Sequence, residues 1–454
     1  MSSRANHRRG ILLRQADRGD AMLHGERPPP LDAWRVATLQ YVDPGGEPAK
    51  AAARSPSTST PSASPPRSCG ARQPPPETPS TSTFGTRIST RRDEPGYTQP
   101  VTSVPPFVKA IHFQNFRVLR KAMLPLDRFA LLIGPNGSGK TTAMLALQCL
   151  AQASLALLNT SRLSGVSFDR LASVFARNDR TSSVEVSVEW SDVPWLMKWT
   201  LSREGGQSFQ PVDHMGQSLR GLDQTDLSTH LKMLAGFQIF SLDSHSIAAP
   251  VGLEPRIQLG PGGENLAGVL DRLRDEAPET FRAFNDEVQR CLPDFDQILF
   301  ETPSSGKRAF VLRSRQGGYK ISAQDLSQGT LFLIAILAIA YGPEPLSIVC
   351  FEEPDRGIHP RLLPEIRDAL YRLSHPELVG AQRQAIQVIV TTHSPYFLDV
   401  YRDHPEAIVV AEKTESGARF ERLADREELA ELLRDTHLGD AWYSGALGGV
   451  PTDS

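Results

Sequence analysis

The sequence has little of what marks secreted, membrane-spanning or strongly basic proteins. Its four cysteines lie far apart in 454 residues without a CxxC spacing, which argues against a zinc site or a disulfide framework. The longest apolar run, Leu331 to Ala340, is roughly half of what a bilayer span requires. The formal net charge of −3 does not draw the chain to nucleic acid or to an anionic membrane. These absences predict a protein of the reducing cytoplasm, without membrane insertion.

Proline and small polar residues are concentrated before residue 107, where 17 of the 36 prolines lie. Such a segment has too few large apolar side chains to offset the entropy of ordering. We expect residues 1–106 to be a disordered tail and residues 107–454 to fold, with about 203–320 as an inserted, family-variable region. A dispensable extension, even an over-called start codon, explains the tail best. A transit peptide would hold fewer acids, and a nucleic-acid arm would concentrate its positive charge.

Hydrophobic patterning after the tail predicts an α/β domain. Period-two alternation or short apolar runs indicate strands at 108–113, 129–133, 184–190, 195–201, 346–351 and 386–391. Helical spacing extends over Lys140–Leu158 and over Leu266–Leu292, and short strands flank Gly317 and Gly318. A last strand pair, 408–411 and 419–423, closes the sheet. Strands that alternate with helices imply a mainly parallel sheet flanked by helices, and 184–201 adds an antiparallel β subdomain.

One glycine-rich loop fits the pattern GxxxxGK[ST] without a mismatch: Gly134, Pro135, Asn136, Gly137, Ser138, Gly139, Lys140 and Thr141. It follows an apolar strand and opens a helix, where backbone N–H groups and the helix dipole favour phosphate. Lys140 can reach the β- and γ-phosphates, the Thr141 hydroxyl can ligate Mg²⁺, and Thr142 supports the same turn. The loop predicts a nucleoside triphosphate site.

Three later segments carry groups that would complete such a site. The strand 346–351 ends in Glu352 and Glu353, of which the first can hold the Mg²⁺ shell and the second can orient or deprotonate water. The strand 386–391 is followed by His393, which can hydrogen-bond the γ-phosphate or the water. Ser327 and Gly329 precede an apolar helix and form a second anion-binding end, which points to a partner's nucleotide. Solvated loop acids, a structural histidine and an ordinary helix cap are the alternative interpretations.

Taken together, the region from about Val108 to Gly449 resembles an AAA-family ATPase of the ABC superfamily, close to RecF-like and OLD-like ATPase cores. The loop at 134–141 resembles Walker A, residues 351–354 Walker B, residues 327–329 the ABC signature, and His393 the switch histidine. Other resembling segments are Gly262 to Ala267, Gly357-Ile358-His359-Pro360, Thr392-His393-Ser394-Pro395, Trp442 to Gly445 and Leu447 to Gly449.

The resemblance implies a P-loop NTPase fold of the ABC type and a head-to-tail homodimer that holds two ATP molecules with Mg²⁺. Lys140, Glu353 and His393 would act in the same subunit, with Thr141 and Glu352 at the metal. Ser327, Gln328 and Gly329 would contact the partner's nucleotide, and Arg117 is a weaker candidate contact. Two departures are a signature without its second glycine, and Glu352 where the family has aspartate. The glutamine loop has no clear position.

Family analogy favours an ATPase whose ATP-driven dimerisation gates a nucleic-acid or effector-protein transaction, as in DNA repair, plasmid maintenance or phage defence. An ATP-binding subunit of a membrane transporter shares the motifs but not the irregular middle region or the sequences around His359 and His393. An OLD-type nuclease needs a metal domain after the ATPase, and the roughly fifty residues up to Gly449 are too few, so a separate nuclease would be required. A non-hydrolysing switch is disfavoured by Glu353 and His393.

Overall fold

The structure is a computed structural model that describes residues 105–159, 167–179, 181–342, 346–380, 383–414, 417–427, 429 and 436–448. All of these residues belong to one compact unit, Pro95–Ser454. Nearly all of the expected disordered tail, 1–106, lies outside the described residues, as do Cys69 and Gly449. The tail and its boundary at residue 107 therefore stay predictions.

Six strands form the central sheet in the order β15-β14-β3-β13-β12-β7. Neighbours from β14 to β7 run parallel, and β15 pairs antiparallel with β14 at one edge. The strands are β3 (Phe129–Ile133), β7 (Phe237–Phe240), β12 (Ile348–Glu352), β13 (Gln387–Thr392), β14 (Ile408–Thr414) and β15 (Gly417–Arg422). This arrangement confirms the mainly parallel sheet expected from the sequence.

Both faces of the central sheet are buried, so its inner strands consist of short continuous apolar runs. Phe129, Leu131 and Ile133 of β3 face one core, and Ala130 and Leu132 face the other. The same alternation continues in β12 and β13. Each strand thereby ties two hydrophobic cores together.

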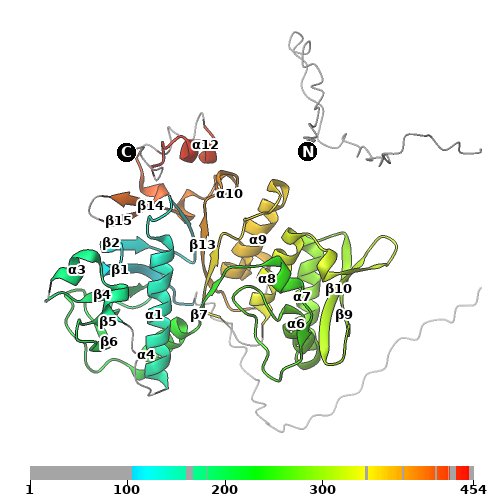
Figure 1. The fold of residues 1–454 in the computed structure, drawn as a ribbon, viewed down its shortest axis with the longest axis horizontal. Helices are drawn as coiled ribbons and strands as arrows, with labels where there is room; N and C mark the ends of the chain where they lie inside the picture. Colours follow the sequence, from blue (N-terminus) through cyan, green and yellow to red (C-terminus); the bar gives the residue numbers. More distant parts are fainter. Residues whose placement is uncertain are drawn as a thin grey trace, which may run out of the picture. The chain divides into compact units, whose positions relative to one another are not determined.

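Helices cover the two faces of the sheet, as Figure 1 shows. The first core contains α8 (Gln328–Tyr341) and α9 (Leu363–Ser374), and the second contains α1 (Lys140–Leu158). Among the helices in the described ranges, α1 is the one long and apolar enough to cross a bilayer, but half of its apolar window is buried inside the protein. It is a core helix of the domain. Short helices are α2 (Phe168–Leu171), α3 (Val174–Asn178), α5 (Ser244–Ala248), α10 (Pro395–Asp399) and α12 (Leu438–Tyr443).

A second, antiparallel sheet of five strands packs into the same core as α1. Its order is β2-β1-β4-β5-β6, with β1 (Val108–Phe116), β2 (Leu119–Pro125), β4 (Val184–Trp190), β5 (Leu196–Leu201) and β6 (Gln207–Val212). Every second residue of β4 is buried, in agreement with the period-two alternation. The expected antiparallel pair is thus β4 and β5.

The stretch expected as an inserted region supplies more than an α-rich insertion. It contributes β6 to the antiparallel sheet and β7 to the edge of the parallel one. It also contains α4 (Gln224–Ala235), α6 (Leu266–Glu276), α7 (Pro278–Cys291), and a small sheet of β8 (Val251–Gly252), β9 (Phe295–Glu301), β10 (Lys307–Ser314) and β11 (Lys320–Ser322). The helical spacing over Leu266–Leu292 corresponds to two helices, α6 and α7. They are separated at Ala277 because the proline at 278 disfavours helical backbone in the residue before it.

A buried side chain at the start of β13 links the two large sheets. Gln387 accepts a hydrogen bond from Val108 N at 2.9 Å and donates to Val108 O at 2.7 Å and to Asp127 O at 2.9 Å. Only 4% of Gln387 is exposed. Its amide therefore satisfies the buried main-chain N–H and C=O groups of Val108 and the part-buried C=O group of Asp127.

We predict that Gln387→Ala destabilises the domain by about 2–3 kcal/mol, because it leaves buried backbone groups without partners. Urea unfolding followed by circular dichroism measures the shift of the midpoint. Gln384→Ala, which removes an exposed glutamine three residues earlier, is the matched control. Equal midpoints for the two variants would show that the Gln387 amide does not hold the sheets together.

Candidate functional site

The candidate site lies where neighbouring parallel strands end together. In the register of the sheet, Ile133 at the end of β3 faces Thr392 of β13, and Glu352 at the end of β12 faces Thr391. Carboxyl ends of parallel strands meet at one edge of the sheet, where open α/β folds bind their ligands. Segments more than 250 residues apart in the sequence are brought together in this way.

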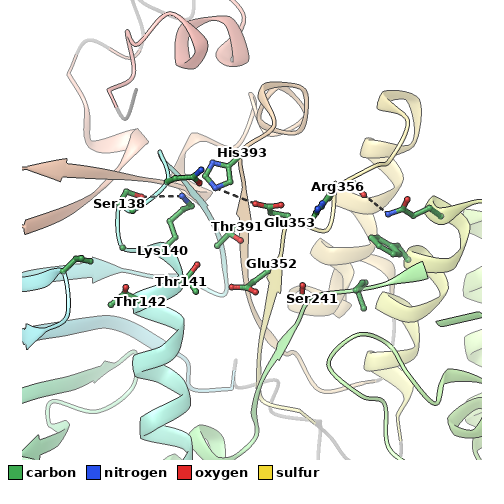
Figure 2. Close-up of a pocket in the computed structure, with 17 residues that line it drawn as sticks. Ser138, Lys140, Thr141, Thr142, Ser241, Glu352, Glu353, Arg356, Thr391 and His393 are labelled. Carbon is green, nitrogen blue, oxygen red and sulfur yellow. Dashed lines mark hydrogen bonds and ion pairs between the residues drawn. The ribbon is translucent and has the colours of Figure 1, made fainter. Parts of the chain in front are cut away.

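A pocket of about 460 Å³ opens at this edge. It collects most of the predicted residues: Asn136, Gly137, Ser138, Gly139, Lys140, Thr141, Thr142, Gln328, Glu352, Glu353 and His393. The remaining lining residues are Val118, Ser241, Leu242, Phe332, Arg356 and Thr391. In Figure 2 the glycine-rich loop lies on one side of the pocket, the two acids lie in the middle and Arg356 lies on the far side.

The glycine-rich loop is held close to the sheet and turns directly into α1. Gly134 has φ near +149°, and a Cβ there would clash with the carbonyl oxygen of Ala411 on β14, so only glycine fits. Gly139, with φ +99°, immediately precedes α1, whose first N–H groups point toward the pocket mouth. The loop thus presents a helix N-terminus and free backbone donors to an anion.

Lys140 is buried beneath this loop and is bound by it. Its ammonium group donates to Gly134 O at 2.7 Å and to Pro135 O at 3.0 Å, with Ser138 Oγ at 3.5 Å. Gly134 and Pro135 therefore do not line the pocket but orient the lysine from behind. Burial lowers the pKa of Lys140 to about 8, and the Glu353 carboxylate partly opposes this effect.

Glu353 adopts a left-handed backbone conformation, with φ +46°. The conformation is costly for a residue with a Cβ, and it is held by a hydrogen bond from Glu353 N to Thr391 O at 3.0 Å. A second bond, from Arg356 N to Glu353 O at 3.0 Å, closes the turn after the strand. The turn directs the Glu353 carboxylate toward His393, whose Nε2 is 3.7 Å from Glu353 Oε1.

His393 is carried by a second strand end that is itself fixed by a buried acid. The Thr392 hydroxyl donates to Asp355 Oδ2 at 3.0 Å and accepts from Ser394 N at 2.9 Å. Burial raises the pKa of Asp355 to about 6, against the hydrogen bond from Thr392. Burial also lowers the pKa of His393, as does the nearby Lys140, while Glu353 opposes the shift. His393 is therefore mainly neutral at pH 7.

The oxygen-bearing side chains of the pocket suit a Mg²⁺ ion that is coordinated mainly by the oxygens of a bound ligand and of water. Thr141, Ser241 and Glu352 all line it, and Ser241 follows the position where Phe240 of β7 pairs with Phe351 of β12. No three His, Cys, Asp or Glu side chains form a metal-binding group in the described part of the chain. Mg²⁺ in such sites keeps several waters and takes one or two protein oxygens plus phosphate oxygens. Thr141 and Glu352 fit that role.

The three predicted signature residues lie in different environments. Ser327 is exposed and caps α8, with Thr330 N donating to its Oγ at 3.2 Å. Gln328 lines the pocket of its own chain. Gly329 is buried, and a Cβ there would come within 2.8 Å of Leu362. Of the three, only Ser327 is exposed to a second molecule without lining the pocket of its own chain. Arg117 is also exposed, next to Val118, but does not line the pocket.

Several pocket residues are not evident from the sequence. Arg356 lies three residues after Glu353, and its place in the same turn is the only signal. Ser241 follows a four-residue strand whose position next to β12 is set by the sheet order alone. Ser241 therefore lies at the end of the strand beside β12, which carries Glu352.

Comparison with known families assigns two parts of the chain. Residues 201–399 match the family described as AAA domain, putative AbiEii toxin, Type IV TA system, and residues 107–191 match the AAA ATPase domain. The chain is also similar to an OLD nuclease from Thermus scotoductus, with 24% identity over 339 residues. That alignment covers 65% of this chain and 60% of the nuclease, so the chain spans about 60% of the length of this curated relative.

Solved structures with a similar fold include two SMC head domains. One is bound to the C-terminal winged-helix domain of ScpA and aligns with a TM-score of 0.49 at 14% identity, over 72% of this chain and 100% of the other. The second, from Pyrococcus furiosus, aligns with a TM-score of 0.46 at 15% identity, over 73% and 100%. The two family matches thus identify AAA-family ATPase domains within residues 107–191 and 201–399, in agreement with the loop, the paired acids and the histidine at one sheet edge.

Proposed function

We propose that this chain binds ATP with Mg²⁺ and hydrolyses it in a head-to-tail homodimer, and that closure of the dimer gates a transaction on nucleic acid or on an effector protein. The observation that carries the proposal is the convergence of Lys140, Glu352, Glu353 and His393 on one pocket. The AAA-family matches support the ATPase activity.

In the proposed complex, the glycine-rich loop surrounds the β- and γ-phosphates. Its backbone N–H groups and the N-terminus of α1 donate to the phosphate oxygens, and the Lys140 ammonium neutralises their charge. Thr141 and Glu352 would hold Mg²⁺, Glu352 either directly or through a water ligand. The ion would supply further neutralisation of the phosphate charge.

Hydrolysis requires a water that attacks the γ-phosphorus as the bond to the β–γ bridging oxygen breaks. Glu353 accepts a proton from this water, which forms inorganic phosphate while ADP departs with the electron pair of the broken bond. Neutral His393, beside the carboxylate, donates a hydrogen bond to a γ-phosphate oxygen. The left-handed turn at Glu353 and the Asp355–Thr392 bond keep both groups in position.

The segment around Ser327 is proposed to complete the site from a second copy of the chain. Ser327, which caps α8, is exposed and does not line the pocket of its own chain, whereas Gln328, the first residue of the helix, does. A second molecule in the opposite orientation would place this end against the γ-phosphate held by the first. ATP would then be the ligand that joins the two copies.

For the gated process we propose an ATPase that controls a separate nuclease or other effector. The similar OLD nuclease points to nucleic-acid chemistry. In the part of the chain that the structure describes, however, no cluster of His, Cys, Asp or Glu offers a metal centre for DNA cleavage. This observation favours the regulator of a separate nuclease over a nuclease in this region.

Glu353→Gln is expected to keep ATP affinity and to lower the steady-state ATPase rate at least about 100-fold, because the amide cannot take the proton. Phosphate release measures the ATPase rate. Light scattering in the presence of ATP measures dimerisation, and the variant should accumulate as a dimer. Glu254→Gln, an equal charge change at an exposed position, is the control. An ATPase rate equal to that of the control would exclude Glu353 as the base.

Lys140→Ala is expected to weaken ATP binding about 100-fold, since it removes two or more charge-assisted contacts to phosphate. Binding of a fluorescent ATP analogue measures the change. Lys413→Ala, at an exposed lysine of β14, should bind as the unaltered protein does. Undiminished binding by Lys140→Ala would mean that the loop does not hold the triphosphate.

ATP affinity should be constant from pH 7 to about 8 and then fall by up to tenfold per pH unit. The free protein has Lys140 with a pKa of about 8, and the phosphates bind only its charged form. Titration with a non-hydrolysable ATP analogue between pH 7 and 9.5 measures the profile. Affinity that is independent of pH up to 9.5 would contradict the assignment.

A further inference from the structure

The start of α8 and the turn after the paired acids are fastened to each other within one chain. Gln328 Nε2 donates a hydrogen bond to the carbonyl oxygen of Arg356 at 2.9 Å, drawn as a dashed line in Figure 2. Gly357 lies directly against this side chain. A Cβ at Gly357 would be 2.8 Å from Gln328 Oε1, and its φ of +73° also suits glycine. The Gln328 amide is therefore enclosed by the backbone of the turn.

A second contact lies one residue further along the helix. Gly329 is buried against the segment that follows the turn, and a Cβ at this position would be 2.8 Å from Leu362 Cδ1 and 3.7 Å from Ile358. Leu331 and Phe332 continue this packing into the first core. The helix start and residues 356–362 can thus move only together, because close-packed segments do not slide independently.

This unit carries groups that serve two different nucleotides in the proposed dimer. Glu353 belongs to the turn and faces the pocket of its own chain, whereas Ser327, the residue before Gln328, is exposed. Arg356 N bonds to Glu353 O at 3.0 Å, so the turn is continuous from the catalytic carboxylate to the carbonyl that Gln328 holds. A shift of Glu353 on ATP binding is transmitted to the N-terminus of α8 by this chain of bonds.

We propose that Gln328 is the positioning residue that couples the two sites: it ties the turn of Glu353 to the helix of Ser327, so that ATP bound in one chain orients Ser327 toward the nucleotide of the other. This inference rests on the proposed dimeric ATPase. It assigns to Gln328 an action within its own chain, in place of the contact with the partner's nucleotide expected for the signature. A glycine at position 328 could not make this link, because it has no side-chain N–H group to donate to the carbonyl oxygen of Arg356.

The test separates nucleotide binding from self-association. Gln328→Met keeps the length and packing of the side chain and removes the donor, and Gln328→Ala removes both. Each is combined with Glu353→Gln, so that hydrolysis does not deplete the ATP complex. We expect the dissociation constant for ATP, measured on dilute monomer, to stay within about twofold, and ATP-dependent dimerisation to weaken five- to tenfold by sedimentation velocity.

Gln324→Ala, an exposed glutamine just before the same helix, is the matched control, and thermal unfolding confirms that each variant is folded. Dimerisation of Gln328→Met equal to that of the control would overturn the coupling role. A parallel loss of ATP affinity would overturn it as well, because Gln328 would then be a nucleotide contact. Failure of Glu353→Gln alone to dimerise with ATP would instead reject the proposed dimeric ATPase.

Discussion

The parallel pairing of β3, β13 and β12 is the constraint on which the site depends. It places the glycine-rich loop, His393 and the two acids side by side, although they are distant in the sequence. Each of these strands is buried on both faces, so a shift in register would move its side chains into differently shaped positions in two close-packed cores. The hydrophobic cores that stabilise the domain therefore also determine the geometry of the pocket.

Burial also changes the pKa of the lysine in the pocket. Lys140 lies under the loop with a pKa lowered by burial, and the Glu353 carboxylate partly opposes that effect. A triphosphate with Mg²⁺ would supply the opposite charges to both. The turn that carries Glu353 is bonded to Thr391 on one side and to Gln328 on the other, through Arg356. Glu353 is thus connected both to the sheet and to the start of α8.

The sequence predicts those parts of the site that are encoded locally. The strand 129–133, the loop after it and Glu352 with Glu353 are recognisable because periodicity and motif spacing act over a few residues. Ser241 could not be found in this way, since its place beside Glu352 depends on which strands become neighbours. The expected role of Gly329 also has a competing explanation in the structure, where its missing side chain makes room for Leu362.

A mixed dimer tests most directly whether one nucleotide is enclosed by two copies. Lys140→Ala removes the loop contact and Ser327→Arg blocks the outward helix end, so each variant alone should lack ATPase activity. If Ser327 acts on the partner's nucleotide, mixing the two variants restores one intact site, and about a quarter of the unaltered rate should return under random pairing of equal amounts. A mixture as inactive as its components would contradict a site shared between two copies.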